Sequence, residues 1–253
     1  MEDLLVTDAA AIKERFLTTG CPRLDAKLGG GIPCRGITQI YGAAGTGKSQ
    51  LALQLCLTVQ LPITAGGLGA GAIYICTETA FPSKRLQQLL RNSEIAKTHS
   101  VNGDVILVNH IATIEDLELC LQRKVPILMS TRKTGLLIID SIAAPYRVED
   151  WRDEVQGKSK RSIGRQLHEL CKNDDICVIC INQVSAVIDG HRIINEDATE
   201  KPALGFTWSS MITTSIYFYR RLASRYACVM LASHLPRLTF QFEVNKSGVR
   251  AAE

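Results

Sequence analysis

Short apolar runs alternate with longer helical patterns over most of this 253-residue chain. The apolar runs predict buried strands at residues 37–41, 71–79, 104–111, 135–141 and 176–183. The segments between them predict a short helix within 21–36, which ends at a run of glycines, and longer helices at 48–61, 82–92, 113–125 and 162–172. Strands that alternate with helices indicate an α/β fold, with a mostly parallel central sheet and helices on both faces.

The pattern changes towards the C-terminus. Apolar segments follow one another there with only short turns between them, at 212–222, 226–233 and 238–244. The last segment alternates strictly between apolar and polar residues, as a half-buried strand does. We therefore expect an antiparallel C-terminal extension of the sheet. Trp208, which lies just before it, is expected in the core.

Composition and charge narrow the function classes. The chain is 46% hydrophobic and 21% charged, and its net charge of +4 permits nucleic-acid binding through a local patch. No apolar run reaches the roughly 18 residues that span a membrane, and the acidic start MEDLLVTDAA lacks the basic region of a secretory signal. Nine cysteines occur, mostly in apolar runs, and Cys177 and Cys180 fall on opposite faces of one strand. We expect reduced core cysteines in an intracellular protein, not a metal site.

A glycine-rich stretch, YGAAGTGKSQ, joins the first predicted strand to a helix and matches the pattern G-x-x-x-x-G-K-[ST] without gaps. Glycines let the backbone turn its N–H groups inward around an anion, and the helix N-terminus adds the positive end of its dipole. In such a loop the lysine bridges the outer phosphates of a nucleoside triphosphate, and the hydroxyl ligates Mg²⁺. The predicted nucleotide site is Gly42, Ala43, Ala44, Gly45, Thr46, Gly47, Lys48, Ser49 and Gln50.

Polar side chains also end other predicted strands. Asp140 ends the run LLIID, where a carboxylate faces the loop and holds Mg²⁺ through a water. Glu78 is expected to be the general base that orients and polarises the attacking water, and a helix-capping or surface acid is the alternative. Gln183 can contact the terminal phosphate and pass that contact to the polar loop after it, and a plain strand-end hydrogen bond is its alternative.

The chain resembles the ATPase core of the RecA-like strand-exchange recombinases, in their eukaryotic branch. Four ordered blocks carry the resemblance: LTTGCPRLDAKLGGGIPCRGITQIYGAAGTGKSQLALQL, YICTETAFPSKRL, LLIIDSIAAPYR and INQV. Within that branch the chain is most similar to a recombinase paralog of homologous recombination. The resemblance implies a tail over 1–17, a RecA-like P-loop ATPase core over 18–253, ATP and Mg²⁺ as ligands, and a nuclear protein that also occurs in the cytoplasm.

The resemblance also implies roles for further residues. Arg85 would stack on adenine, and Gln183 would sense the terminal phosphate. DNA-binding loops would lie within Arg147–Lys160 and Val184–Ala203, with contacts from Arg147, Arg152, Lys158, Lys160, His191 and Arg192. The stretch SHLPR, with His234 and Pro236, would cap ATP bound in a neighbouring subunit, and VTDA would insert its Val6 and Ala9 into the next subunit. From the residues alone, a solvated basic segment and a frayed tail stay open as alternatives.

Two departures from the family pattern shape the functional hypothesis. The family usually carries a small helical domain before the core, where this chain has only its first residues, and Leu231 and Ala232 stand where an acid is expected before the cap. We expect a slow, DNA-stimulated ATPase that assembles with another recombinase paralog, the C-type one if the resemblance holds, on single-stranded or branched DNA. It would help the filament of the main recombinase in double-strand break repair. The alternatives are an interaction subunit that uses ATP as structural glue, and a hexameric helicase-like motor.

Overall fold

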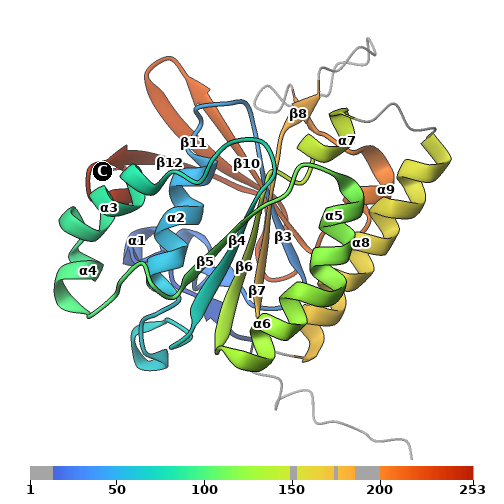
Figure 1. The fold of residues 1–253 in the computed structure, drawn as a ribbon. Helices are drawn as coiled ribbons and strands as arrows, with labels where there is room; N and C mark the ends of the chain where they lie inside the picture. Colours follow the sequence, from blue (N-terminus) through green and yellow to red (C-terminus); the bar gives the residue numbers. More distant parts are fainter. Residues whose placement is uncertain (1–13, 149–152, 174–175, 186–199, 253) are drawn as a thin grey trace, which may run out of the picture.

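The computed structural model describes residues 14–148, 153–173, 176–185 and 200–252. A nine-stranded sheet forms its centre, in the order β13-β12-β11-β10-β3-β7-β6-β4-β5 (Figure 1). The parallel part comprises β3 (Ile37–Tyr41), β4 (Gly71–Cys76), β5 (Ile106–His110), β6 (Thr134–Asp140) and β7 (Cys177–Asn182). These strands confirm the parallel sheet that the apolar runs predict.

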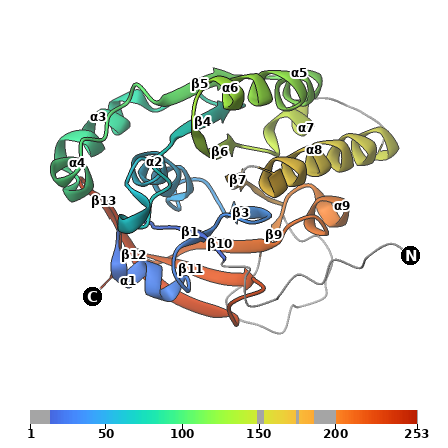
Figure 2. The same cartoon turned by 90° about the horizontal axis from the view of Figure 1, so that it is seen from below.

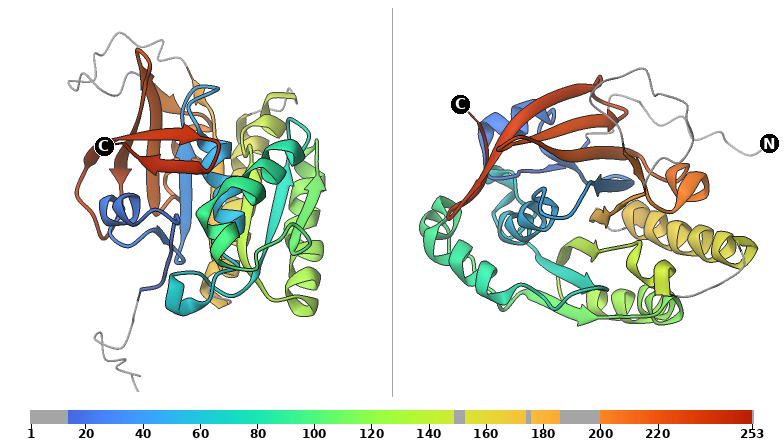
Figure 3. Two further views of the ribbon diagram at one scale, coloured as in Figure 1. Left: turned by 90° about the vertical axis from the view of Figure 1, so that its left-hand side faces the viewer. Right: turned by 90° about the horizontal axis from the view of Figure 1, so that it is seen from above.

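The C-terminal strands extend this sheet. β10 (Thr214–Arg221) pairs in parallel with β3, and the strands that then follow in antiparallel order are β11 (Ser224–Leu231), β12 (Leu238–Asn245) and β13 (Gly248–Ala251). Figure 3 shows them in orange and red, standing beyond β3. The predicted antiparallel extension is confirmed.

Helices cover both faces of the sheet, which curves around α2 (Figure 2). One face packs against the helices α1 (Pro22–Lys27), α2 (Lys48–Thr58), α3 (Ser83–Asn92) and α4 (Glu94–Thr98). The other face packs against α5 (Ile114–Leu119), α6 (Val125–Thr131), α8 (Asp153–Asn173) and α9 (Gly205–Ser209). Every residue of α2 from Leu51 to Thr58 is buried, the polar Gln54 and Thr58 included, which explains why that segment is mostly apolar and has no exposed polar face.

The structure differs from the sequence predictions at three segments. The helix predicted at 113–125 continues as a π-helical turn, Cys120–Lys124, into α6. The run AAAIKERF at 9–16 could form a short helix by its pattern alone, but Phe16–Leu17 forms strand β1, paired with β2 (Ile32–Pro33), and residues 1–13 lie outside the described part. The helix predicted at 162–172 begins earlier, at Asp153.

The early start of α8 has a visible cause. The Ser159 hydroxyl is buried and lies 2.8 Å from Glu118 Oε1 and 3.1 Å from the hydroxyl of Tyr146, so this turn is anchored to α5 and to α7 (Ala144–Val148). Lys158 and Lys160, expected in a DNA-binding loop, therefore lie on a helix. That part of the expected loop is wrong.

The expectations for Trp208 and for the buried cysteines are confirmed. Trp208 is fully buried and donates its indole N–H to Gln39 Oε1 at 2.8 Å. Cys177 and Cys180 are free, buried and packed into the cores on opposite faces of the sheet. Within the described ranges, no group of histidine, cysteine or acidic side chains can hold a metal ion, and none of the helices has the length and apolar character of a membrane span.

Candidate nucleotide-binding site

A cleft of about 1010 Å³ opens at the carboxyl ends of β3, β7, β6 and β4, which are neighbours in the sheet. The glycine-rich loop after β3 forms one wall. The polar residues that end the other strands also line the cleft, namely Glu78 after β4, Asp140 in β6 and Gln183 after β7. The structure thus brings together the residues that the sequence placed at strand ends, because the carboxyl ends of parallel strands share one edge of the sheet.

Glycine is required at both ends of the loop. Gly42 has φ +150°, and a Cβ there would lie 1.9 Å from the carbonyl oxygen of Phe218 in β10. Gly47 has φ +115° and forms the N-cap of α2, so the first turn of that helix opens directly from the loop. Free N–H groups in the first turn of a helix attract anions, and this turn lies on the cleft.

Lys48 lies in the hollow of the loop. Its ammonium donates to the carbonyl oxygens of Gly42 at 2.7 Å and Ala43 at 2.8 Å. Burial lowers the pKa of Lys48, and the nearby carboxylate of Asp140 opposes that shift. A cation held only by neutral loop carbonyls can exchange those partners for phosphate oxygens, which bind an ammonium more strongly.

Ser49 and Asp140 form the oxygen pair that fits a magnesium ion. The Ser49 hydroxyl donates to Asp140 Oδ2 at 2.7 Å, across the cleft from α2 to β6. The phenol of Tyr74, from β4, donates to the same oxygen at 2.6 Å. Burial and the charge of Asp140 raise the pKa of Tyr74 well above its ordinary value, so the phenol stays protonated. A hydroxyl and a carboxylate are the ligand types that Mg²⁺ takes from proteins.

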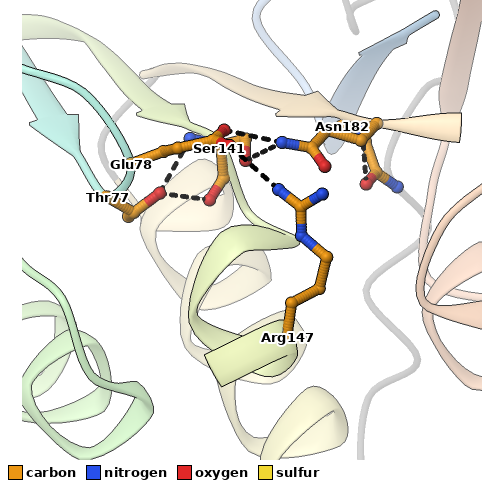
Figure 4. A network of polar contacts seen from close by, with 6 residues as sticks. Thr77, Glu78, Ser141, Arg147 and Asn182 are labelled. Atoms are coloured by element: carbon orange, nitrogen blue, oxygen red, sulfur yellow. Dashed lines mark hydrogen bonds and ion pairs between the residues drawn. The ribbon is translucent and has the colours of Figure 1, made fainter. Parts of the chain in front are cut away.

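Glu78 lies between two polar partners (Figure 4). Its Oε1 accepts from Arg147 Nη2 at 3.0 Å, and its Oε2 accepts from Gln183 Nε2 at 2.6 Å. Gln183 also lies 3.4 Å from the hydroxyl of Ser141. The carboxylate is about half exposed and faces the cleft, so water can reach it.

The far end of the cleft holds Arg85, from α3. Its Nε donates to Gln50 Oε1 at 2.6 Å, and its Nη2 donates to the carbonyl oxygen of Asn245 at 2.6 Å. Asn245, the last residue of β12, and Lys246, in the turn that leads to β13, line the cleft. Sequence reasoning missed this turn and Tyr74, because neither carries a motif; only strand register brings them to the site.

The remaining predicted residues lie elsewhere. Lys158 is exposed on α8, and the ammonium of Lys160 lies 5.3 Å from the centre of the Tyr146 ring. His234 and Pro236 lie in the turn between β11 and β12, at the opposite end of the strands from the cleft. The His234 ring packs 5.1 Å from Phe16. The other predicted interface and DNA contacts lie outside the described residues, namely Val6, Ala9, Arg152, His191 and Arg192.

A parallel sheet with a glycine-rich loop between β3 and α2, and an acid at the end of β6, defines the class of P-loop α/β proteins. The Rad51 family model matches residues 13–252, and the chain belongs to the Rad51 family. The RecA-like core expected from the sequence is therefore confirmed.

Curated relatives agree with this assignment. DNA repair protein XRCC3 from Bos taurus is 37% identical over 252 residues, which is 92% of this chain and 74% of the relative. The same protein from Mus musculus is 38% identical over 260 residues, with the same two shares. DNA repair protein rhp57 from Schizosaccharomyces pombe is 30% identical over 285 residues, or 95% of this chain and 80% of the relative. The resemblance to a recombinase paralog is confirmed.

Proposed function

We propose that this chain is an ATP-binding recombinase paralog that hydrolyses ATP slowly and acts on single-stranded or branched DNA during homologous recombination. One observation carries the proposal: Asp140 and Glu78 face one cleft from neighbouring strand ends, beside an intact phosphate loop that carries Lys48. The relatives that match over most of the chain are DNA repair proteins by name, which supports a role in DNA repair in the nucleus. The restriction to double-strand breaks and an additional cytoplasmic pool are part of our proposal.

Each cleft residue then has a chemical role. Lys48 leaves the loop carbonyls and bridges the outer phosphates of ATP. Ser49 and Asp140, which Tyr74 holds in place, would bind Mg²⁺, the aspartate through a water. When bound, Mg²⁺ neutralises the phosphate charge. A water oxygen attacks the γ-phosphorus, the bond from that phosphorus to the bridging oxygen of ADP breaks, and Glu78 accepts the proton of the water.

The remaining cleft residues set the position of the nucleotide. Arg85 lies at the far end from Glu78, where its planar guanidinium would stack on adenine. Its bonds to Gln50 and to the Asn245 carbonyl hold that plane in place. Gln183 would contact the γ-phosphate and report its presence to the segment that follows β7.

Two surfaces away from the cleft support assembly into a hetero-oligomer. The turn with His234 and Pro236 lies at the other end of the strands, where it would cap the ATP of a neighbouring subunit. Strand β5 is an edge of the sheet, and an apolar cavity of about 420 Å³ lies beside it, between Leu107 and Leu128. Such an edge can accept a strand from the tail of another recombinase paralog, the C-type one by our proposal.

Turnover measurements discriminate this proposal from its alternatives. We expect slow ATP hydrolysis by the chain with its native partner, and a clear increase on adding single-stranded DNA. A subunit that uses ATP only as structural glue would bind ATP without turnover under either condition. A hexameric helicase-like motor would unwind a forked duplex, which we do not expect. Absence of turnover in the complex with DNA would overturn the proposed activity.

Assembly gives a second test. Leu231, which is half exposed, and Ala232 replace the acid expected before the cap, so we expect a weak or absent homofilament and a tight pair with another paralog. Bound ATP should stabilise that pair, because a ligand at an interface adds its binding energy to the assembled state. Val6→Glu should weaken contacts made by the tail and leave ATP affinity unchanged. Sedimentation of the isolated chain with ATP measures its self-assembly, and long homopolymers would contradict the expected absence of a homofilament.

A further inference from the structure

We propose that Arg147 and Gln183 form a two-armed latch on Glu78, so that fast hydrolysis of bound ATP requires nucleic acid as well. The inference rests on the proposed function, because it takes Glu78 as the base and Arg147 as a DNA contact. It goes further by giving Arg147 a second role, in which the arginine restrains the base until a nucleic-acid phosphate takes the arginine away.

The geometry of the carboxylate suggests the latch. Arg147 engages one oxygen of Glu78 at 3.0 Å, and Gln183 engages the other at 2.6 Å (Figure 4). Both carboxylate oxygens are therefore occupied by hydrogen-bond donors of the protein. An oxygen that is held in this way is not available to orient the attacking water. Release of the arms frees both oxygens for that water.

The two arms come from the two segments expected to lead into DNA-binding loops. Arg147 is in the last turn of α7, directly before residues 149–152. Gln183 lies between β7 and β8 (Val184–Ser185), and residues 186–199 follow β8. Glu78 is thus held at the point where both segments meet the nucleotide cleft. Contacts of nucleic acid with either segment would therefore change the hydrogen bonds that Arg147 and Gln183 donate to the Glu78 carboxylate.

The backbone around Glu78 is fixed, so the latch opens by motion of side chains. The Thr77 hydroxyl donates to the Ser141 carbonyl at 2.5 Å, and the Ser141 N–H donates to the Thr77 hydroxyl at 2.8 Å. These buried bonds tie the end of β4 to the end of β6. In contrast to these buried bonds, the side chain of Arg147 is 55% exposed and can swing towards solvent.

Each arm has a ligand that can remove it. Phosphate competes well for an arginine, because the planar guanidinium can donate two parallel hydrogen bonds to its oxygens. The γ-phosphate of ATP offers Gln183 an acceptor in the same cleft. With both ligands bound, both oxygens of Glu78 are free to orient water. With ATP alone, the arginine arm stays closed and turnover stays low.

The test is the variant Arg147→Gln in the full chain with its native partner. Without DNA, we expect kcat for ATP to rise about fivefold, which corresponds to about 1 kcal/mol for an exposed ion pair, while KM for ATP is unchanged. The stimulation by single-stranded DNA should fall by at least the same factor. Arg147→Lys keeps a charge beside Glu78 and should restore a low basal rate. A residue that merely stabilises the fold would not raise kcat when removed.

Controls separate the latch from the proposed activity. Arg91→Gln removes an exposed arginine of α3 that does not line the cleft, and should leave turnover unchanged with and without DNA. If Arg147→Gln loses DNA stimulation with an unchanged or lower basal rate, Arg147 is a DNA contact only and the latch is overturned. If Glu78→Gln in the same assay hydrolyses ATP like the unmodified chain, the proposed role of Glu78 fails instead.

Discussion

Replacing Lys48 by alanine is expected to weaken ATP binding by about 100-fold or more, because two charge-assisted hydrogen bonds to phosphate, each of about 1.5–3 kcal/mol, are lost. The fold should survive. Among the described residues, the Lys48 ammonium donates hydrogen bonds to the loop carbonyls of Gly42 and Ala43, and burial lowers the pKa of Lys48, so holding the cation there costs stability in the absence of a ligand. A nucleotide titration measures the affinity, and thermal unfolding without nucleotide measures the stability.

A matched control is Lys84→Ala. Lys84 is an exposed lysine of α3 that does not line the cleft, so its removal changes the net charge equally without touching the loop. The control should bind ATP like the unmodified chain. Unchanged affinity in Lys48→Ala would remove the phosphate-loop interpretation, and a large loss of thermal stability would show that the lysine is chiefly structural.

The sequence was sufficient for the parts of the site that follow from local pattern. The loop from Gly42 to Ser49 is contiguous, and its glycines have the positive φ values that the motif requires. Asp140, Glu78 and Gln183 each end an apolar run, and parallel strands bring such ends together without any knowledge of register. Alternation of strands and helices likewise predicts the central sheet.

Other features depend on register and on contacts between distant segments. Tyr74 reaches Asp140 because β4 and β6 align Tyr74 with Ile138, two residues before the acid. The start of α8 is set by Ser159, whose hydroxyl bonds to Glu118, far away in sequence. Arg147 and Glu78, which form an ion pair, are even further apart in sequence. A single chain carries no signal for such pairings, since each partner alone looks like an ordinary surface or core residue.

The contact between Arg147 and Glu78 changes how the basal activity is interpreted. If the base is restrained when no DNA is present, slow turnover is a property of the closed latch, not of a damaged site. The complete set of Lys48, Ser49 and Asp140 agrees with that view. Weak basal hydrolysis would then be compatible with a chemically competent subunit, and DNA-bound complexes are the state in which its chemistry should be measured.

Replacing Glu78 by glutamine is expected to slow hydrolysis by about 100-fold or more, the usual range for a lost general base, while ATP stays bound. The amide has the shape of the acid but cannot accept the proton of the attacking water. Binding is retained because the phosphate loop and Arg85 are untouched. Single-turnover hydrolysis with DNA and partner present measures the chemical step, and a nucleotide titration measures binding.

The control for this substitution is Glu94→Gln. It makes the same chemical change in an exposed glutamate of α4, whose ion pair with Lys97 at 3.0 Å lies outside the cleft. Turnover in the control should equal that of the unmodified chain. Equal turnover in Glu78→Gln would show that another group accepts the proton. A fall in ATP affinity as large as the fall in rate would show instead that Glu78 positions the nucleotide, since the loss of a base alone lowers kcat and leaves binding intact.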